Sequence, residues 1–549
     1  MKTIYFNGRV YTGELPLRSA FIVENGLFSA VGSDEEMLSK CVDRGENCKR
    51  IDLGGRFVCA GFNDSHMHLL NYGQSLLSAK LYEHTGSLSA VLDCMRAHLA
   101  AFRPENSAWL RGRGWNQDYF TDEKRMPNRH DLDSVSTEFP IMITRACGHC
   151  CVVNSKALEL CGITAEAVSP EGGAIGIENG EPDGRLYDNA MEIAFDKMPL
   201  PDKAALKKMI KLACSALNSY GITSSQTDDY CVFRQIPYET VNEAYRELEE
   251  AGELTVRVYE QCNFTELDEL RRFFEDGNMT GKGSELFKIG PLKLLGDGSL
   301  GSRTAHLSVP YIGDEINKGF SLFSKEQFNS LCSYANEKGM QIAVHAIGDA
   351  CLDSVLDAIE NALDEHPRTD HRHGIVHCQI SRRDQLERMI RLKLHIYAQS
   401  IFLDYDNHIV EKLVPKPLSE TSYNWKTLLD GGLTVSNGSD CPVELPDVMK
   451  GIECAVTRRS MDGTGPYLLD QAFTVKEAID SFTINGAIAS FEEGIKGRIA
   501  PGLLADFVIL DADPYEADKE ELHSIGILKT FLGGREVYSK KKAELDREQ

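Results

Sequence analysis

Residues 57–69 read FVCAGFNDSHMHL, an apolar run that leads into Asp64, His66 and His68. In a β-strand, residues i and i+2 face the same side, so His66 and His68 would direct two imidazoles towards one point. Two neutral imidazoles on a rigid element provide a first pair of ligands for a catalytic Zn²⁺ or a similar cation. Two histidines alone are weak evidence. They become informative if the chain supplies further ligands in the same structural context.

The interior of the chain, from about residue 61 to 490, alternates strand-like and helix-like segments. The strand candidates are the apolar runs at 58–64, 221–228, 254–262, 289–296, 340–348, 373–379, 394–400 and 433–440. Helical patterns such as 203–221 and 325–339 lie between most of them and end in glycines that suit helix C-termini. This alternation predicts an α/β fold with a parallel (β/α)₈ barrel of the TIM type.

The two ends of the chain differ from the interior. Residues 3–60 contain short strand-like runs separated by Asn-Gly and Gly-Gly pairs, which are typical of hairpin turns. Strand–turn–strand patterns return at 497–514 and 525–539. We therefore expect residues 1–60 and 491–549 to form one small composite β-sandwich, and residues 61–490 to form the barrel domain.

A long segment separates the first two predicted barrel strands. Residues from about 75 to 215 exceed what one helix and two loops require. The segment includes a Gly/Glu-rich stretch at 171–184 that reads as a loop. We predict an insertion over the mouth of the barrel, acting as a lid or specificity subdomain.

Size, charge and cysteine usage argue against several classes of protein. A chain of 549 residues is too long for one hydrophobic core. The net charge of −24 opposes nucleic-acid binding, because phosphates would be repelled over most of the surface. No stretch approaches the ~18 apolar residues of a membrane helix. The 16 cysteines lack a disulfide-framework spacing and the N-terminus lacks an apolar signal core, so we expect free thiols and a cytoplasmic location.

In barrels of this kind the chemistry lies at the C-terminal ends of the strands. Residues suited to metal binding stand at five of the predicted strand ends: His66 and His68 on the first strand, Lys293 on the fourth, His345 on the fifth, His377 on the sixth and Asp440 on the eighth. Each has a simpler structural interpretation, since a strand histidine is often a hydrogen-bonded core residue and an aspartate can begin a turn. Six such residues at corresponding positions favour a metal site.

Lys293 is the hardest of the six to explain structurally. It lies in the apolar run KIGPLKLLG (288–296), where an unpaired ammonium group is very costly. Either a carboxylate pairs with it, or the amine is modified. Carboxylation by CO₂ would convert the amine into an anionic carbamate that can bridge two cations.

Eight motifs lie in a fixed order along the chain: GFNDSHMHL (61–69), GWNQD (114–118), GHCCVVNSKAL (148–158), PLKLLGDGSLGSRTA (291–305), IAVHAIGDA (342–350), IVHCQ (375–379), NGSDCPVE (437–444) and GRIAPGLLADFVILDADP (497–514). With this set the chain resembles the metal-dependent amidohydrolase superfamily, specifically the YtcJ-like branch of the amidohydrolase 3 type. The resemblance implies a (β/α)₈ barrel with a composite β-sandwich. It also implies a site for one or two divalent metal ions, with Zn²⁺ favoured.

The resemblance assigns roles to the residues at the strand ends. One metal would be held by His66, His68 and Asp440, and a second by His345 and His377. Carboxylated Lys293 would bridge the two ions. Asp440 would carry a proton from metal-activated water to the leaving amine.

Five further residues are candidates for supporting the metal site or holding the substrate. Asp64 would support the histidines, and Asp297 would support the loop after Lys293. His149, Arg303 and Trp115 are candidates for binding the substrate or its oxyanion. Their simpler interpretations are a core histidine, a salt-bridged arginine and a packing tryptophan.

The predicted activity is hydrolysis of a non-peptide carbon–nitrogen bond in a small molecule, such as an amide, an N-acyl amine or an N-formyl amine. A deaminase with one metal ion is an alternative, which would need an acidic group near the fifth strand but not Lys293. An ester or phosphoester hydrolase is another. A regulatory or binding protein without catalysis would be expected to have lost at least one of the six residues. The sequence leaves open the substrate, the metal and the oligomeric state, a homo-oligomer included.

Overall fold

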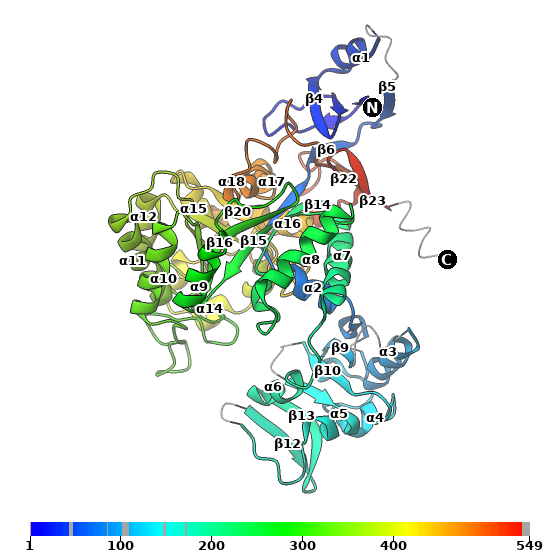
Figure 1. The fold of residues 1–549 in the computed structure, drawn as a ribbon, viewed down its shortest axis with the longest axis vertical. Coiled ribbons are helices and arrows are strands. Elements are labelled where there is room, and N and C mark those ends of the chain that lie inside the picture. The colour runs from blue at the N-terminus through cyan, green and yellow to red at the C-terminus, as the bar shows by residue number, and fades with distance from the viewer. Residues whose placement is uncertain are drawn as a thin grey trace. The chain divides into compact units, whose positions relative to one another are not determined.

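The computed structural model describes residues 2–42, 48–84, 86–101, 109–146, 150–170 and 173–540. The chain divides into two compact units, whose elements Figure 1 labels in chain order. Unit 1 comprises Met1–Leu69, Cys214–Arg234 and Tyr245–Gln549, and unit 2 comprises Leu70–Ala213 and Gln235–Ala244. Within the described ranges, no helix combines the length and the apolar character that a membrane crossing requires.

Unit 1 contains the predicted barrel sheet, in which each strand is parallel to its neighbours. In chain order its strands are β7 (Phe62–Met67), β14 (Ile222–Thr227), β15 (Arg257–Asn263), β16 (Phe287–Leu295), β17 (Ile342–Ala346), β18 (Gly374–His377), β19 (His395–Ala398) and β20 (Val435–Asn437). The spatial order follows the chain order, as expected for a (β/α)₈ barrel. The predicted fold class is confirmed.

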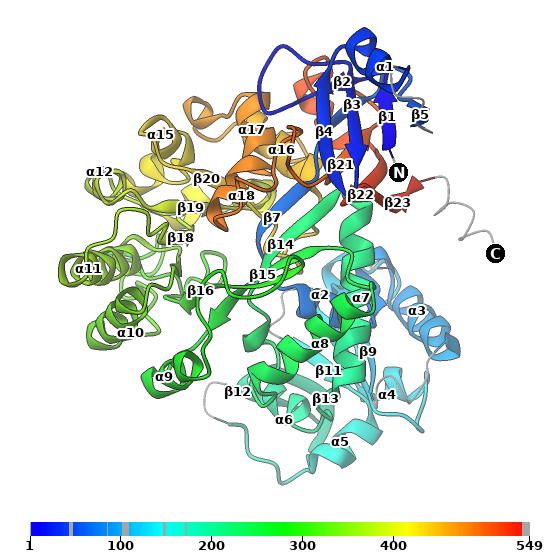
Figure 2. The same cartoon turned by 45° about the horizontal axis from the view of Figure 1, so that its top comes forward.

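The helices of unit 1 that follow these strands include α9 (Leu267–Glu275), α10 (Lys325–Glu337), α11 (Asp349–Glu365), α12 (Arg383–Leu392), α15 (Trp425–Asp430), α16 (Val448–Thr457), α17 (Val475–Ser481) and α18 (Ile484–Ala489). Figure 2 shows α10, α11 and α12 on the outer side of strands β16–β18. The sequence of α10 determines where it begins, because Ser324 and Gln327 form a capping box. Helix α11 buries Leu352, Val355 and Ile359, which recur at helical spacing on one face.

The barrel closes where the first and last strands meet. The peptide nitrogen of Asp440 donates to the carbonyl oxygen of His66 over 2.8 Å, and that of His68 donates to the carbonyl oxygen of Cys441 over 2.8 Å. These two bonds join the end of β7 to the segment that follows β20. Closure therefore brings the two ends of the barrel sheet together at the predicted metal ligands.

Both chain termini contribute to a pair of small sheets in unit 1. One contains β4 (Leu27–Gly32), β3 (Ala20–Glu24), β1 (Lys2–Phe6) and β5 (Cys48–Asp52), and the other contains β2 (Arg9–Val10), β6 (Phe57–Ala60), β21 (Phe507–Leu510), β22 (Ile527–Leu532) and β23 (Arg535–Ser539). Their shared core is aromatic. Phe507 stacks on Phe531 with ring centroids 4.3 Å apart and meets Phe21 at 5.1 Å. The C-terminal strands thus need the N-terminal strands to bury their apolar face.

One predicted strand proves to be two. Residues 58–64 were expected to form a single barrel strand, but β6 belongs to the terminal sheet and β7 to the barrel. Gly61 donates to the carbonyl oxygen of Asp506, whereas Phe62 donates to that of Gly221. A Cβ at Gly61 would lie 2.3 Å from the Thr223 hydroxyl, so the chain passes between the sheets where only glycine fits.

Unit 2 is built on its own six-stranded sheet. In spatial order the strands are β12 (Gly173–Glu178), β13 (Glu181–Asp188), β11 (Cys150–Val153), β10 (Ile141–Arg145), β9 (Leu110–Trp115) and β8 (Ala79–Lys80). The prediction of a loop at 171–184 is wrong, because β12 and β13 form a hairpin there. Asn179 and Gly180 both have positive φ, of 54° and 82°, which is typical of the tight turn that an Asn-Gly pair favours.

Of the helices that lie wholly within unit 2, α3 (Leu88–Ala101) is the longest. The others include α4 (Arg129–Asp133), α5 (Ser155–Cys161) and α6 (Glu192–Phe195). Helix α3 buries Leu88, Val91 and Met95 in a core with strands β9 and β10. The predicted boundaries of the terminal domain, the barrel domain and the insertion remain predictions.

Candidate metal centre

The six residues expected to hold metal converge in unit 1. Contacts join them into one connected group, which comprises His66, His68, Lys293, His345, His377 and Asp440 together with Asp228. Each lies in or just after the C-terminal end of its barrel strand. Because the strands are parallel, side chains that are distant in sequence meet at the same end of the barrel.

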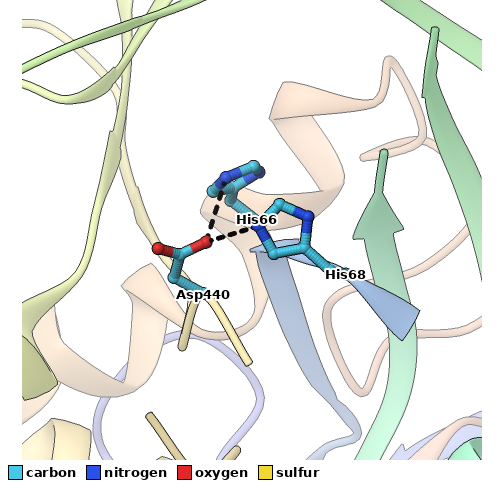
Figure 3. A group of neighbouring side chains, drawn as sticks. All are labelled: His66, His68 and Asp440. Carbon is cyan, nitrogen blue, oxygen red and sulfur yellow. Dashed lines mark hydrogen bonds and ion pairs between the residues drawn. The ribbon is translucent and has the colours of Figure 1, made fainter. Parts of the chain in front are cut away.

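His66, His68 and Asp440 form the most compact set of candidate ligands. One ligand atom from each lies within 4.8 Å of the other two. The Oδ1 atom of Asp440 is 3.0 Å from His68 Nε2 and 3.3 Å from His66 Nε2, and Figure 3 shows its carboxylate directed at both rings. Asp440 has a left-handed backbone conformation with φ of 57°, and this conformation orients its side chain.

Two glutamines fix the tautomers of two histidines. Gln261 donates from Nε2 to the carbonyl oxygen of Ser65, so its Oε1 accepts from His66 Nδ1 over 2.8 Å. Gln399 donates to the carbonyl oxygen of Tyr397, and its Oε1 accepts from His377 Nδ1 over 2.7 Å. Because Nδ1 carries the proton in each ring, the neutral imidazole keeps its lone pair on Nε2. That tautomer is the one a metal ligand needs.

The donor set fits a cation at this place. Burial, reinforced by the charge of Lys293, lowers the pKa of His66, which favours the neutral ring. The lone pair on His66 Nε2 then faces the Asp440 carboxylate, and two electron-rich atoms 3.3 Å apart repel each other. A divalent cation bound by both atoms would replace that repulsion with two favourable contacts.

Asp228 links His68 to Lys293, and the sequence did not reveal this role. Its Oδ1 forms an ion pair with His68 Nδ1, and its Oδ2 accepts from Lys293 Nζ over 3.3 Å. Burial opposes the charge on Asp228, but His68 and Lys293 outweigh it and hold the pKa of Asp228 well below its usual value. The carboxylate orients His68 as a ligand and supplies the partner that the buried Lys293 requires.

The charge of His68 follows from its two carboxylate neighbours. Burial disfavours the imidazolium, yet Asp228 and Asp440 raise the pKa of His68 well above its usual value. Cys231 lies beside the same pair, and His68, Asp228 and Cys231 form a second group with ligand atoms within 4.8 Å of one another. Its thiol donates to the backbone carbonyl oxygen of Asp228 over 3.0 Å.

His345 and His377 form the second pair of candidate ligands. Their ring centroids are 4.4 Å apart, and the His377 ring lies 5.6 Å from that of His66. His345 donates from Nε2 to the carbonyl oxygen of Gly298 over 3.1 Å, which leaves its lone pair on Nδ1. Burial and the neighbouring His345 hold the pKa of His377 well below its usual value, so that ring is neutral.

Asp297 contacts both His345 and the loop that follows Lys293. Its Oδ1 lies 3.3 Å from His345 Nε2 and accepts from the peptide nitrogen of Ile347 over 3.0 Å. Its Oδ2 accepts from the peptide nitrogens of Gly348 and His306, each over 2.8 Å. A single carboxylate therefore joins the loops that follow β16 and β17.

Asp64 joins the first and last strands. Its carboxylate accepts from the peptide nitrogen of His66 over 3.2 Å and from both the peptide nitrogen and the hydroxyl of Ser439. Burial raises the pKa of Asp64 to about 7, although the hydrogen bonds from Ser439 and His66 act in the opposite direction. Asp64 thus positions ligands without lying among them.

The three candidates for substrate binding are dispersed. Arg303 lies in unit 1 on the loop after β16, has φ of 58°, and forms no ion pair among the described residues. Trp115 ends β9 in unit 2, where it is fully buried in the core and its indole nitrogen has no hydrogen-bond partner. His149 lies outside the described residues. A substrate role for each remains a prediction.

Three residues of the site were missed by sequence reasoning: Asp228, Gln261 and Gln399. They stand in or directly after β14, β15 and β19, the three barrel strands that provide no predicted ligand. The rule that found the ligands, polar residues at strand ends, would have found these as well. Their partners were not visible in the sequence, because each contact joins residues on different barrel strands.

Comparison with known proteins is consistent with this geometry. The model of the amidohydrolase family matches residues 49–538. The chain is 32% identical over 546 residues to YtcJ of Bacillus subtilis (strain 168), a protein named as an amidohydrolase, covering 98% of this chain and 100% of that one. It is 27% identical to an N-substituted formamide deformylase of Arthrobacter pascens, covering 94% of each chain.

A solved structure shares the fold. The crystal structure of an uncharacterized metal-dependent hydrolase from Pyrococcus horikoshii matches with a TM-score of 0.78 and 27% identity. The match covers 94% of this chain and 99% of that one. The barrel and its additional sheets therefore occur together in another protein.

Replacing Gln261 with leucine should weaken metal binding. The substitution removes the acceptor for His66 Nδ1, so the ring loses the contact that fixes its tautomer, and metal affinity should fall about 10–100-fold. Competition with a chromophoric chelator measures this. Gln226→Leu is the matched control, because Gln226 is also buried in the barrel but donates to the carbonyl oxygen of Gly486. Unchanged affinity in Gln261→Leu would contradict the assigned role.

Proposed function

The chain belongs to the amidohydrolase family, and on that premise we propose that it hydrolyses a carbon–nitrogen bond other than a peptide bond, in an amide, an N-acyl amine or an N-formyl amine. The observation that carries the proposal is the convergence of six ligand-type residues at the barrel's strand ends, with the tautomers of His66 and His377 already set for metal binding. The name of the Arthrobacter pascens relative supports the N-formyl class.

The metal would be held by this chain's own side chains. His66, His68 and Asp440 would bind one ion, and His345 and His377 a second. Bound there, a divalent cation such as Zn²⁺ would polarise the substrate carbonyl and lower the pKa of water towards ~7. The ligand types suit several divalent cations, and the three imidazoles whose Nδ1 is held by a neighbouring side chain favour Zn²⁺ among them.

Asp440 is the residue proposed to move the proton. Its Oδ1 lies where the two imidazoles of β7 converge, so a water molecule activated there would be within reach of the carboxylate. Burial opposes the charge, but the hydrogen bond and the positive charge of His68 hold the pKa of Asp440 well below its usual value, so the carboxylate begins as a base. It would accept the proton of the water and deliver it to the leaving amine.

Lys293 has two possible states, and they distinguish two forms of the site. In the first, Nζ attacks CO₂, a nitrogen–carbon bond forms and a proton is released, giving a carbamate that would bridge two ions. In the second, Lys293 stays an ammonium group paired with Asp228 at 3.3 Å. The ion pair favours the second candidate function, a one-metal hydrolase or deaminase on the same barrel.

The remaining assignments follow from composition and covalent state. A small-molecule substrate is proposed, and the net charge of −24 argues against nucleic acid. The 14 cysteines whose side chains the structure describes are free thiols, which supports the proposed cytoplasmic location.

Metal removal tests the proposed function directly. Exhaustive dialysis against a chelator should abolish hydrolysis of a panel of N-formyl and N-acyl amines, and Zn²⁺, Mn²⁺ or Co²⁺ should restore it. Release of formate or acid and amine is measured by chromatography. The same panel should include amino-substituted heterocycles and simple esters. Hydrolysis by the metal-free protein, or turnover of the heterocycles alone, would contradict the proposal.

Asp440→Asn should lower kcat by about 10²–10⁴-fold, because asparagine cannot accept the proton. The measurement is kcat on the best substrate of the panel, with circular dichroism to verify the fold. Asp430→Asn is the control, since Asp430 is an exposed carboxylate that pairs with Lys426. Turnover by Asp440→Asn at the rate of the unmodified protein would remove Asp440 from the mechanism.

Lys293→Ala separates the two states of Lys293. If the carbamate bridges two ions, the variant should bind fewer ions per chain than the unmodified protein, and acetate or propionate should partly restore metal content and activity. Elemental analysis gives the stoichiometry. One ion per chain in both proteins, with no effect of added carboxylate, would establish the ion-paired lysine and the one-metal site.

A further inference from the structure

A buried carboxylate stands one helical turn beyond the metal centre. Asp406 ends α13 (Leu403–Asp406), the short helix after β19, and is buried. Its Oδ2 accepts from the Tyr423 hydroxyl over 2.8 Å and from Gln379 Nε2 over 3.3 Å. Its other oxygen, Oδ1, accepts no hydrogen bond from any described side chain or peptide group, so half of the carboxylate is free to bind something else.

Gln379 presents a second free acceptor at the same place. Its side chain is buried, and its Oε1 has no hydrogen-bond partner. Because Nε2 of the same amide group donates to Asp406, Oε1 lies beside that carboxylate. A buried carbonyl oxygen without a donor is unfavourable, and native proteins usually satisfy such an atom. Asp406 Oδ1 and Gln379 Oε1, the acceptor pair, therefore lack a hydrogen-bond donor.

The acceptor pair adjoins the metal centre. Gln379 follows the proposed ligand His377 by two residues. Phe402, in the turn η5 (Ser400–Phe402), stacks on the His377 ring with centroids 5.8 Å apart and planes 15° from parallel. Asp406 follows Phe402 by four residues, so the two side chains share one side of the helical turn. A molecule bound at His377 could extend along Phe402 to Asp406.

The local charge favours a cation. Asp406 forms no ion pair among the described residues, and neither does Glu444, which lies four residues after Asp440. Lys450, the basic side chain that acts on Glu444, pairs with Asp404 at 2.5 Å. Burial and the charge of Glu444 raise the pKa of Asp406 to about 7, which means that its negative charge is not neutralised by a base. A bound ammonium group would stabilise the ionised carboxylate of Asp406 and lower its pKa.

We propose that Asp406 and Gln379 form a subsite that binds a positively charged hydrogen-bond donor of the substrate, a primary ammonium or an amidinium group. The N–H groups of such a cation match the two free acceptors, Asp406 Oδ1 and Gln379 Oε1. The inference rests on the proposed function and narrows it: the substrate is an amide that carries a second, cationic nitrogen. The subsite acts in specificity, whereas Asp440 acts in the chemical step.

Two matched series of substrates test the subsite in the metal-loaded, full-length protein. One series is N-formyl diaminoalkanes with a free ammonium group, and the other is N-formyl alkylamines with a methyl group in its place, from ethylene to hexamethylene spacers. The unmodified protein should prefer the ammonium series in kcat/KM by about 10–100-fold at the best length. Asp406→Asn and Gln379→Met should each reduce that ratio towards one.

Asp404→Asn is the matched control. It makes the same change on the same helix, but Asp404 already pairs with Lys450 and accepts from the peptide nitrogen of Met461. The ratio should not change in this variant. Equal kcat/KM for the two series in the unmodified protein, or an unchanged ratio in Asp406→Asn with its melting temperature preserved, would overturn the subsite and leave the proposed function intact.

Calorimetry separates the two proposals. Pentylamine, which carries an ammonium group, should bind the unmodified protein more tightly than the uncharged 1-pentanol, and Gln379→Met should remove the difference. That result, with no hydrolysis of either series, would support the subsite and reject the proposed function for these amides. Equal binding of pentylamine and 1-pentanol would overturn the subsite and indicate that only ordered water occupies the acceptor pair.

Discussion

The hydrogen bonds of one buried carboxylate, Asp64, determine where the proposed metal ligands stand. The strands β7 and β20 are the two ends of the barrel sheet, and Asp64 joins them by accepting from the peptide nitrogens of His66 and Ser439. These bonds offset part of the cost of burying its charge. Gly438 permits the approach, because a Cβ there would lie 2.5 Å from the peptide nitrogen of His66. The same hydrogen bonds that close the barrel thus also bring His66, His68 and Asp440 together.

The barrel strands fall into two sets according to the roles of the residues at their ends. Five strands carry the residues proposed to bind metal, and β14, β15 and β19 carry Asp228, Gln261 and Gln399, which orient the histidines. These three strands thereby place an oxygen atom next to the Nδ1 atoms of His66, His68 and His377. Such partners fix the tautomer, and the tautomer decides whether Nε2 can bind a cation. The same strand β18 that carries His377 leads to Gln379, so metal binding and substrate selection would share one element.

Much of the fold and of the site could be predicted from the sequence. Apolar runs alternating with helical patterns gave the parallel barrel, and polar residues at its strand ends gave the six ligand candidates. The errors arose where local pattern and tertiary pairing differ. Residues 58–64 look like one strand, but they pair with two different sheets on either side of Gly61. The stretch at 171–184 is rich in glycine and glutamate, yet Asn179-Gly180 makes it a hairpin.

By itself, the sequence determined the type and order of the elements and the residue types at the strand ends, because hydrophobic periodicity and turn residues act locally. The tertiary structure alone decided which oxygen faces which ring nitrogen. It paired Asp228 with His68 and Lys293, and it left Gln379 Oε1 beside Asp406 without a donor. Hydrogen bonding and charge pairing depend on distances of about 3 Å between residues far apart in the chain. Only the closed barrel establishes those distances.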